Sequence, residues 1–471
     1  MKNNNTTKVS YVFFGPANVG KSTIIGYMKT FHFNKARFAI EIKKIKKKLG
    51  NNYISDRLYS YFVDEAKDEY KKNIEKKHGI TKGTSKYTHI SKMGDFYLID
   101  TPGGDGYESQ RFKGISIANI GIFAIEIKQL LNLRDDNHEK TFEKYIKTVQ
   151  NFFASWYVWQ KLFGDNNSII LLTKYDSFPS EEYFEEAKKI LISIIGDNND
   201  IPIIPTSVDV NTESRQDVNI YTKLKSEWYK GKTLIEAIED KYNYLISIDL
   251  IDELLLFYNR RYENVTGVGP IIKWKVSGGT LNINDKISIV PVLVNGKYLK
   301  VNATIKSMHD ENNKNIERAI SGDIVNIALS SINYENTTIH KDKVEILNTS
   351  IIVSSNREIV FGNVLHASIA FNRCSKDELS VLKGFKEGTQ VKILWYSKVL
   401  FPTITSLSNN DEELLIVFDL TNKLDAIPLN SQVALPIENL PKRILLQNKL
   451  THENDLSRNF DCVVKKISIT S

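Results

Sequence analysis

The feature that most constrains the fold is a nine-residue stretch near the N-terminus, GPANVGKST at 15–23. It satisfies G-x-x-x-x-G-K-[ST] and lies between an apolar run, 9–15, and a helical pattern. This context predicts a strand, a loop whose N–H groups enclose a phosphate, and a helix. The alternative, a glycine-rich turn that carries Lys-Ser by chance, does not explain the flanking elements. The predicted nucleotide contacts are Asn18, Val19, Gly20, Lys21, Ser22 and Thr23, with the Ser22 hydroxyl offered to Mg²⁺.

The first 240 residues alternate short apolar runs with helical patterns. The later runs are at 96–100, 120–127, 168–174 and 201–207, and a helix is predicted over 181–195. Strand, helix and strand at this rhythm predict an α/β P-loop domain, a mostly parallel sheet with helices on both faces.

From about residue 250 the sequence becomes short alternating segments with turn signals, including Asn295-Gly296. Such segments are typical of hairpins in small antiparallel barrels. We therefore predict three domains: a nucleotide-binding P-loop domain at 1–248, a second domain that is a β-barrel at 249–349, and a third, also a β-barrel, at 350–471.

Composition places the chain among ordinary globular proteins, with 41% apolar and 25% charged residues. No apolar run approaches a membrane span, and the N-terminus is polar, so we expect a cytoplasmic protein without a membrane partner. Cys374 and Cys462 lie far apart and neither belongs to a CxxC motif, which argues against disulfide and zinc sites. The net charge is +7, with basic runs at 43–48 and 71–79. These runs fit a phosphate-rich partner such as ribosomal RNA; the alternative is a solvated helix face.

Two later segments favour GTP over ATP. The run LLTKYD at 171–176 resembles the guanine motif [N/T]-K-x-D, in which Asp176 accepts from the guanine edge and Lys174 packs along the base. The PTS run at 205–207 follows the next strand, which places Thr206 and Ser207 near guanine O6. Adenine has a different donor pattern and would leave Asp176 unpaired, at a cost of roughly 1–3 kcal/mol or more. With Thr173, these residues complete the predicted base site.

Together these motifs resemble the translational GTPases of the elongation factor 1-alpha and Tu class. Supporting segments are HGITKGTS at 78–85, SEWYKGKTLIEAIE at 226–239 and VTGVGPIIKWKVSGG at 265–279. The resemblance implies that Thr81 and Ser22 ligate Mg²⁺, Asp100 holds the metal through water, and the Gly103 N–H binds the γ-phosphate. It also implies switch segments that the γ-phosphate orders.

The sequence departs from that family at four places. The family carries a catalytic histidine directly after D-x-P-G, where this chain has Gly104. Asn18 replaces an aspartate, Thr173 replaces an asparagine and so removes a bracing amide, and R-G-I-T-I-D has become HGITKG at 78–83. His78 and His89 are the histidines nearest to Gly104 in the sequence, and no sequence feature assigns the catalytic role to either. The nucleotide contacts survive while the hydrolytic residues do not.

The loss of hydrolytic residues beside retained nucleotide contacts predicts a pseudo-GTPase with little or no hydrolysis and no catalytic residue of its own. The alternative explanation is general sequence divergence in this lineage, without selection for binding alone. The resemblance is to the ribosome-rescue and release-factor branch, including the fungal superkiller adaptor that joins the exosome to its helicase complex. We therefore expect GTP or GDP as ligand, Mg²⁺ as cofactor, and the ribosome or the mRNA-decay machinery as partner, without sequence-specific DNA binding. An adaptor of that type has a long N-terminal region, which leaves open that the chain is a fragment.

Two other functions remain open. One is an active translational GTPase that delivers a tRNA-like protein or a release factor to the ribosome. The other is the GTPase subunit of bacterial sulfate adenylyltransferase, which shares the segment resembling 226–239 but normally keeps the histidine.

Overall fold

The computed structural model describes, with short gaps inside several ranges, residues 9–63, 85–131, 142–152, 167–195, 201–247, 255–370, 384–435 and 460–468. They form two compact units, one within 8–244 and one within 245–444 and 458–471. No helix among these residues is long and apolar enough to cross a membrane.

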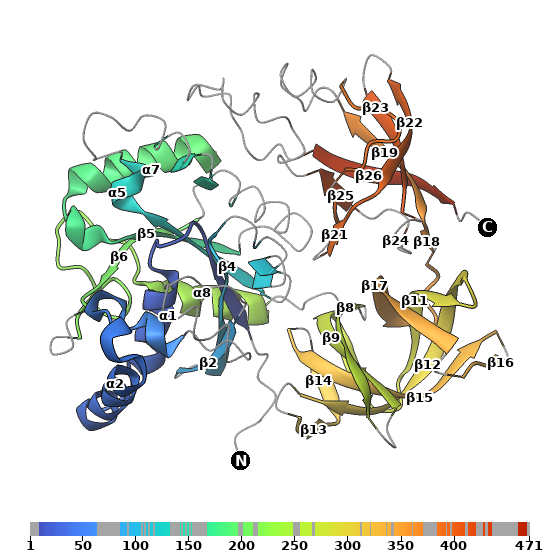
Figure 1. Cartoon of the computed structure of the whole chain (residues 1–471), viewed down its shortest axis with the longest axis horizontal. Coiled ribbons are helices and arrows are strands. Elements are labelled where there is room, and N and C mark those ends of the chain that lie inside the picture. The colour runs from blue at the N-terminus through green and yellow to red at the C-terminus, as the bar shows by residue number, and fades with distance from the viewer. Residues whose placement is uncertain are drawn as a thin grey trace. The chain divides into compact units, whose positions relative to one another are not determined.

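The first unit contains a seven-stranded sheet in the order β2-β3-β1-β4-β5-β6-β7 (Figure 1). Its central strands β3, β1, β4, β5 and β6 are parallel, and β2 and β7 are antiparallel edges. The strands are β1 (Ser10–Phe14), β2 (Ser85–Ser91), β3 (Gly94–Asp100), β4 (Ile120–Glu126), β5 (Ser168–Thr173), β6 (Ile203–Val208) and β7 (Asp217–Val218). Strands β1, β4 and β5 are buried along their whole length, as expected for parallel strands covered on both faces.

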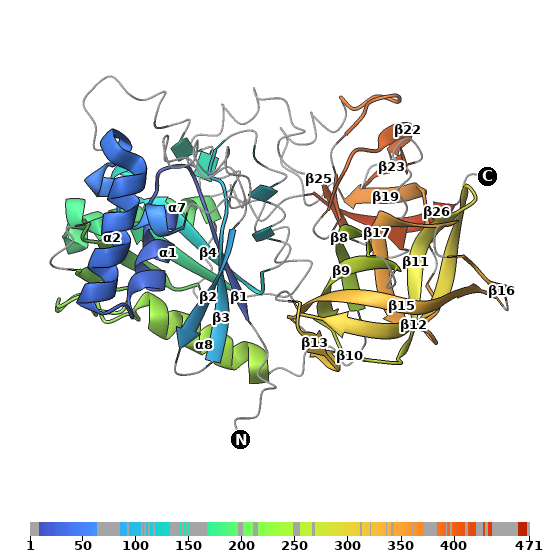
Figure 2. The same ribbon diagram turned by 60° about the horizontal axis from the view of Figure 1, so that its bottom comes forward.

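Helices surround this sheet (Figures 1 and 2). They are α1 (Lys21–Thr30), α2 (Lys35–Leu49), α5 (Ile127–Leu130), α7 (Glu181–Ile195) and α8 (Leu234–Ser247), with 3₁₀ turns at η1 (Gly50–Asn52), η2 (Ser55–Arg57), η3 (Ser60–Phe62) and η4 (Tyr175–Ser177). Helix α7 has the predicted bounds. Helix α8 begins at Leu234, because Thr233 and Glu236 form a capping box: the Thr233 N–H donates to the Glu236 carboxylate at 2.8 Å, and the Glu236 N–H donates to the Thr233 hydroxyl at 3.2 Å.

The first sheet of the second unit closes on itself. Six antiparallel strands pair around a ring, β11-β17-β8-β9-β15-β12, and β12 pairs with β11 again. The strands are β8 (Leu255–Val265), β9 (Gly269–Gly278), β11 (Lys286–Val294), β12 (Lys297–His309), β15 (Ile324–Tyr334) and β17 (Val344–Ser354), with short β10 (Thr280–Asn282), β13 (Asn315–Ile316), β14 (Arg318–Ile320) and β16 (Thr337–Thr338) beside them. The predicted Asn-Gly turn joins β11 to β12, with positive φ at Asn295 and Gly296 (51° and 79°).

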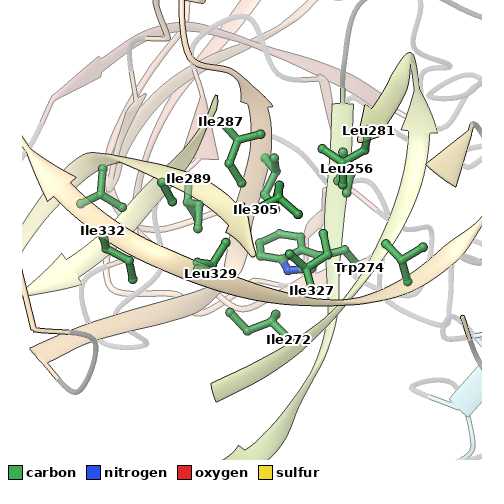
Figure 3. Packing of buried hydrophobic residues seen from close by; sticks show 14 of the residues in the cluster. Leu256, Ile272, Trp274, Leu281, Ile287, Ile289, Ile305, Ile327, Leu329 and Ile332 are labelled. Atoms are coloured by element: carbon green, nitrogen blue, oxygen red, sulfur yellow. The ribbon is translucent and has the colours of Figure 1, made fainter. Parts of the chain in front are cut away.

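Trp274 of β9 lies inside this barrel, only 1% exposed (Figure 3). The surrounding side chains are aliphatic and come from several strands, including Leu256, Ile305, Ile327 and Leu329. Each fully buried aliphatic side chain contributes about 1.5–3 kcal/mol relative to an exposed one. The alternation in the sequence therefore marks a packed barrel interior.

The remaining strands form a second antiparallel sheet in the order β21-β20-β25-β26-β19-β23-β22. They are β19 (Val364–Ala370), β20 (Ile393–Trp395), β21 (Lys398–Leu400), β22 (Thr403–Asn409), β23 (Glu413–Asp419), β25 (Gln432–Leu435) and β26 (Phe460–Ser468), and β18 (Phe361–Gly362) pairs separately with β24 (Ile427–Pro428). The predicted fold class, a P-loop α/β domain before antiparallel barrel-like sheets, is confirmed. Strand β17 runs across the predicted 349/350 boundary and pairs with β11 as far as Ser354, so the first barrel continues past that point.

Candidate nucleotide site

The phosphate loop follows β1 at the carboxyl edge of the parallel sheet. Two of its glycines are required by the backbone. Gly15 has a φ of +135°, and a Cβ there would lie 2.2 Å from the carbonyl oxygen of Ala124 in β4. Gly20, at the N-cap of α1, has a φ of +93°. Both conformations favour glycine, so the loop shape follows from the motif. The loop opens toward the N-terminus of α1, where free N–H groups attract a phosphate.

Lys21 is held inside this loop. Its ammonium donates to the carbonyl oxygens of Gly15 at 2.9 Å and Pro16 at 2.6 Å, and the residue is only 5% exposed. Burial lowers the Lys21 pKa to about 8; the Asp100 carboxylate raises it and the Arg111 guanidinium lowers it by smaller amounts. The cation is desolvated and positioned before any ligand arrives, which suits a phosphate oxygen as its partner.

Ser22 and Asp100 meet behind the loop. The Ser22 hydroxyl donates to Asp100 Oδ2 at 2.7 Å, and Asp100 is fully buried at the end of β3. Next to it, the Thr101 hydroxyl donates to the Phe13 carbonyl at 2.7 Å, which ties β3 to β1.

These oxygen donors fit Mg²⁺, a hard cation that is held by one or two protein oxygens together with nucleotide phosphates and water. Among the described residues no group of three or more His, Cys, Asp or Glu side chains could hold a metal without a nucleotide. Ser22 and Asp100 would hold the ion, and a bound ion would neutralise phosphate charge. Thr81, the other predicted ligand, lies outside the described residues.

The two glycines after Pro102 differ in their surroundings. A Cβ on Gly103 would lie 2.6 Å from the Ala17 nitrogen and from the Pro16 carbonyl, so this residue lies directly against the phosphate loop. Among the described residues, a Cβ on Gly104 would meet the Tyr107 ring alone, at 3.4 Å, which is ordinary van der Waals contact. The described residues therefore require glycine at 103 but tolerate a β-carbon at 104.

The base side of the site follows β5 and β6. Thr173 and Thr206 are register partners where these parallel strands end. The Thr173 hydroxyl lies 2.6 Å from the Val19 carbonyl of the phosphate loop and 3.1 Å from the Ile125 carbonyl. The sequence suggested that replacing asparagine with Thr173 removes a contact that braces the phosphate loop. The Thr173 hydroxyl makes such a contact itself, because it reaches the Val19 carbonyl of that loop.

Lys174 has a left-handed backbone, with a φ of +57°, and its ammonium lies 3.0 Å from the Glu126 carboxylate. Glu126 is buried at the end of β4 and also accepts from the Gln129 amide at 2.5 Å. This ion pair holds Lys174 at the carboxyl ends of β4 and β5, and Asp176, two residues later, is exposed.

The last predicted segment lies beside these residues. Thr206 is fully buried, and its hydroxyl has no hydrogen-bond partner among the residues that the structure describes. Ser207 is also buried and pairs with Val218 of β7. Asn219 supports the segment by donating from its side-chain amide to the Pro205 carbonyl at 2.9 Å.

The structure thus gathers most predicted residues at one edge of the sheet. Asn18 is exposed with a φ of +63°, Val19 is buried, and Thr23 lies half-buried in the first turn of α1. Sequence reasoning missed Glu126 and Arg111. A strand-terminal carboxylate at the same sheet edge could have signalled Glu126, whereas no local pattern marks Arg111, a buried cation that acts on Lys21.

His89 does not take the missing histidine's place. It lies in β2 opposite Phe96 of β3, four residues before Asp100, which is about 13 Å along the strand. It is buried, with its Nε2 atom 3.2 Å from the Tyr221 hydroxyl. Its role in the described structure is packing.

Comparison with known proteins identifies relatives by sequence, although no protein-family model matches the chain. Elongation factor 1-alpha of Thermofilum pendens is 25% identical over 332 residues, covering 69% of this chain and 68% of that protein. The eukaryotic peptide chain release factor GTP-binding subunit of Schizosaccharomyces pombe is 24% identical over 332 residues, covering 68% of this chain and 44% of that one. Another elongation factor 1-alpha, from Caldivirga maquilingensis, is matched over 59% of its length.

Solved structures share the fold. The GTPase-like domain of Ski7 from S. cerevisiae aligns with a TM-score of 0.65 at 14% identity, covering 98% of this chain and 97% of that one. A bacterial selenocysteine-specific elongation factor aligns with a TM-score of 0.53 at 14% identity, covering 91% of this chain and 56% of that one. The chain is similar in sequence to elongation factor 1-alpha and to the release-factor GTPase subunit and shares its fold with these solved structures, which confirms the resemblance seen in the sequence.

Proposed function

We propose that this protein binds GTP at the site described and retains it with little or no hydrolysis. The observation that carries the proposal is the contrast at the DTPGG loop, where Gly103 is fixed against the phosphate loop and Gly104 has space but no side chain. The described residues include the phosphate-contacting ones, whereas position 104, where the family that the sequence resembles carries a water-positioning histidine, has no side chain.

The phosphate contacts support GTP binding. Lys21 is buried with its ammonium on two loop carbonyls, and its charge would contact the β and γ oxygens. Ser22 and Asp100 supply oxygens for a magnesium ion. The relatives support this role: the Ski7 GTPase-like domain has been solved with GTP, and also with GDP and inorganic phosphate.

The base contacts support guanine. Asp176 is exposed next to Lys174, which the Glu126 carboxylate holds in place. The two N–H groups on the guanine edge match a carboxylate acceptor, whereas adenine has no such pair. The expected discrimination is roughly 1–3 kcal/mol, or about ten- to hundredfold in affinity.

The low hydrolysis follows from Gly104. Related GTPases need a side chain that positions the attacking water, and help from an activating partner spans roughly 10⁵ in rate. A glycine can neither orient nor polarise water through a side chain. The protein would therefore remain GTP-bound and present a stable surface to a partner.

The partner we propose is the cytoplasmic mRNA surveillance and decay machinery, with the exosome and its helicase complex or the ribosome as the docking target. Support comes from the overall match to the Ski7 GTPase-like domain, which covers nearly the whole of both chains. The second candidate is an active translational GTPase that delivers a tRNA-like protein or a release factor. The preserved Ser22 and Asp100 pair favours this candidate, because a hydrolytic site would need it as well.

Titration calorimetry with GTP, ATP and their diphosphates tests the binding step. We expect Mg²⁺-dependent GTP binding and at least tenfold weaker ATP binding. Asp176→Asn should weaken GTP and favour xanthosine triphosphate, whose 2-carbonyl accepts from the new amide, while Asp56→Asn, another exposed carboxylate, should change neither. Equal affinity for ATP and GTP would contradict the guanine assignment.

Co-purification tests the adaptor step. The chain, loaded with GTP or stripped of nucleotide, would be incubated with purified exosome, its helicase complex or ribosomes. Binding to exosome or helicase components that needs GTP supports the adaptor. Binding to ribosomes alone, with GTP turnover, supports the second candidate.

A further inference from the structure

Helix α2 presents an unusually basic outer face. Its inner side is anchored by Phe38 and Ile42, which are buried in the unit. The rest of the helix surface is exposed and carries basic side chains along the whole helix: Arg37, Lys43, Lys44, Lys47 and Lys48 away from the buried stripe, and Lys35 and Lys46 at its margins. Ile40 is in the middle of this face and is 55% exposed. We call this surface the α2 face; the helix lies at the edge of its unit in both views (Figures 1 and 2).

Several of these charges oppose helix stability. Lys35 and Arg37 are in the first turn, which holds no acidic residue, and cations there interact unfavourably with the helix dipole. Lys43 with Lys47, and Lys44 with Lys48, are like-charge pairs four residues apart, which destabilise a helix by roughly 0.2–0.5 kcal/mol each. Only Lys46, Lys47 and Lys48, in the last turn, interact favourably with the helix dipole.

The two other helices of 14 or 15 residues have acidic first turns, whereas the shorter α1, which begins with Lys21 of the phosphate loop, has none. Helix α7 begins with Glu181 and Glu182, and α8 has Glu236 in its first turn. Stability alone therefore does not explain the charge pattern of α2. A role in binding a polyanion would explain the charge pattern, because such a surface requires cations along the full length of the helix.

Within the described residues, few of these charges are neutralised. Lys44 pairs with Glu41 at 2.8 Å, an exposed contact, and Lys46 lies over the Tyr53 ring at 5.1 Å. Lys43, Lys47 and Lys48 have no carboxylate within 4.0 Å in this part of the chain. Their charge is available to an external anion.

We propose that the α2 face is an RNA-binding surface that contacts the phosphate backbone without reading sequence. Lysine ammonium groups bind phosphates as point charges, which suits backbone contact rather than base readout. A membrane surface fits less well, because an interfacial helix needs a broad exposed apolar face and α2 buries Phe38 and Ile42 in the protein. This proposal does not rest on GTP binding.

The test is fluorescence anisotropy with a labelled single-stranded RNA of about 20 nucleotides and the full chain. The test variant carries Lys43→Gln, Lys44→Gln, Lys47→Gln and Lys48→Gln. The matched control carries Lys286→Gln, Lys297→Gln, Lys306→Gln and Lys314→Gln, four exposed lysines of the barrel unit. Both change the net charge equally.

We expect the α2 variant to lose about tenfold or more in RNA affinity at moderate salt, and its log–log salt slope to fall by up to about 3, since each phosphate contact contributes about 0.7. The control should lose less than twofold. Replacing the same four lysines with arginine should preserve affinity, because charge and helix propensity are kept. The glutamine variant should also melt no earlier than wild type, because it removes like-charge pairs.

Equal loss in test and control variants would overturn the proposal, since net charge rather than location would then govern binding. Unchanged RNA affinity in the α2 variant would overturn it as well. So would α2-dependent binding to vesicles containing phosphatidylserine in the absence of RNA binding, which would assign the face to a membrane.

Discussion

Gly103 lies directly against Pro16: a Cβ atom on Gly103 would be 2.6 Å from both the carbonyl carbon and the carbonyl oxygen of Pro16. The D-T-P-G loop and the phosphate loop therefore touch through their backbones. The next residue, Gly104, has no comparable neighbour in the part of the chain that the structure describes. Position 103 must therefore be glycine for steric reasons, whereas the described structure does not require glycine at position 104.

The contrast predicts opposite results for two alanine substitutions. Gly103→Ala should displace the phosphate loop and weaken GTP binding by at least tenfold, since a contact of 2.6 Å to backbone atoms forces a shift. Gly104→Ala should bind GTP within about twofold of wild type, which matches its ordinary contact distance. Calorimetric titration of both variants checks the pair, and equal losses would contradict the geometry.

Thr173→Val should weaken the connection between the base and phosphate halves of the site. Valine keeps the branched shape but removes the hydroxyl that contacts the Val19 carbonyl, at a cost of about 1–2 kcal/mol. We expect GTP affinity to fall about five- to thirtyfold. Thr173→Ser keeps the hydroxyl and serves as the control; a loss of the same size with serine would show that the methyl group matters instead.

Lys21 should make nucleotide binding dependent on pH. Burial is the main cause that lowers the Lys21 pKa to about 8, and phosphate oxygens of a bound nucleotide would raise it again. Below pH 8 the ammonium is already charged and affinity should be flat. Above pH 8, GDP binding should weaken by up to about tenfold per pH unit and take up a proton. Calorimetry in buffers of different ionisation enthalpy measures the uptake, and its absence at pH 8.5 would contradict this.

His89 should reduce stability in acid. Its pKa is lowered to about 4, first by burial and second by His32, so the folded state disfavours its protonated form. The contribution is complete above pH 6.5 and is lost as the pH falls from 6.5 toward 4, by up to about 3 kcal/mol. His89→Phe should flatten this part of the stability curve in urea unfolding at stepped pH. An unchanged acid slope in the variant would assign the loss to other groups.

The fold was predictable where local pattern and burial agree. Helix α7 begins and ends at the predicted residues, because Glu181 and Glu182 start it and its apolar spacing is regular. The turn at Asn295 and Gly296 was predictable because few other residues adopt its backbone. Strand β2 was missed, because its polar residues show alternation only once β3 lies beside it.

The sequence predicted those site residues that belong to the nucleotide-binding motifs. The partners of the motif residues come from other elements: Glu126 at the end of β4 anchors Lys174, and the Val19 carbonyl receives the Thr173 hydroxyl. Neither partner has a sequence signature, because each contact exists only after the strands are aligned. The space at Gly104 likewise depends on where Tyr107 lies.

Single-turnover hydrolysis of GTP, with and without ribosomes, tests the central claim most directly. An active elongation factor 1-alpha serves as the positive control, and Gly104→His, checked for folding by circular dichroism, serves as the comparison variant. We predict that ribosomes leave the rate of the wild-type chain unchanged within about twofold, against a range of up to about 10⁵ for stimulated GTPases. A ribosome-stimulated rate in the wild-type chain would contradict the account, because Gly104 would then not separate binding from turnover.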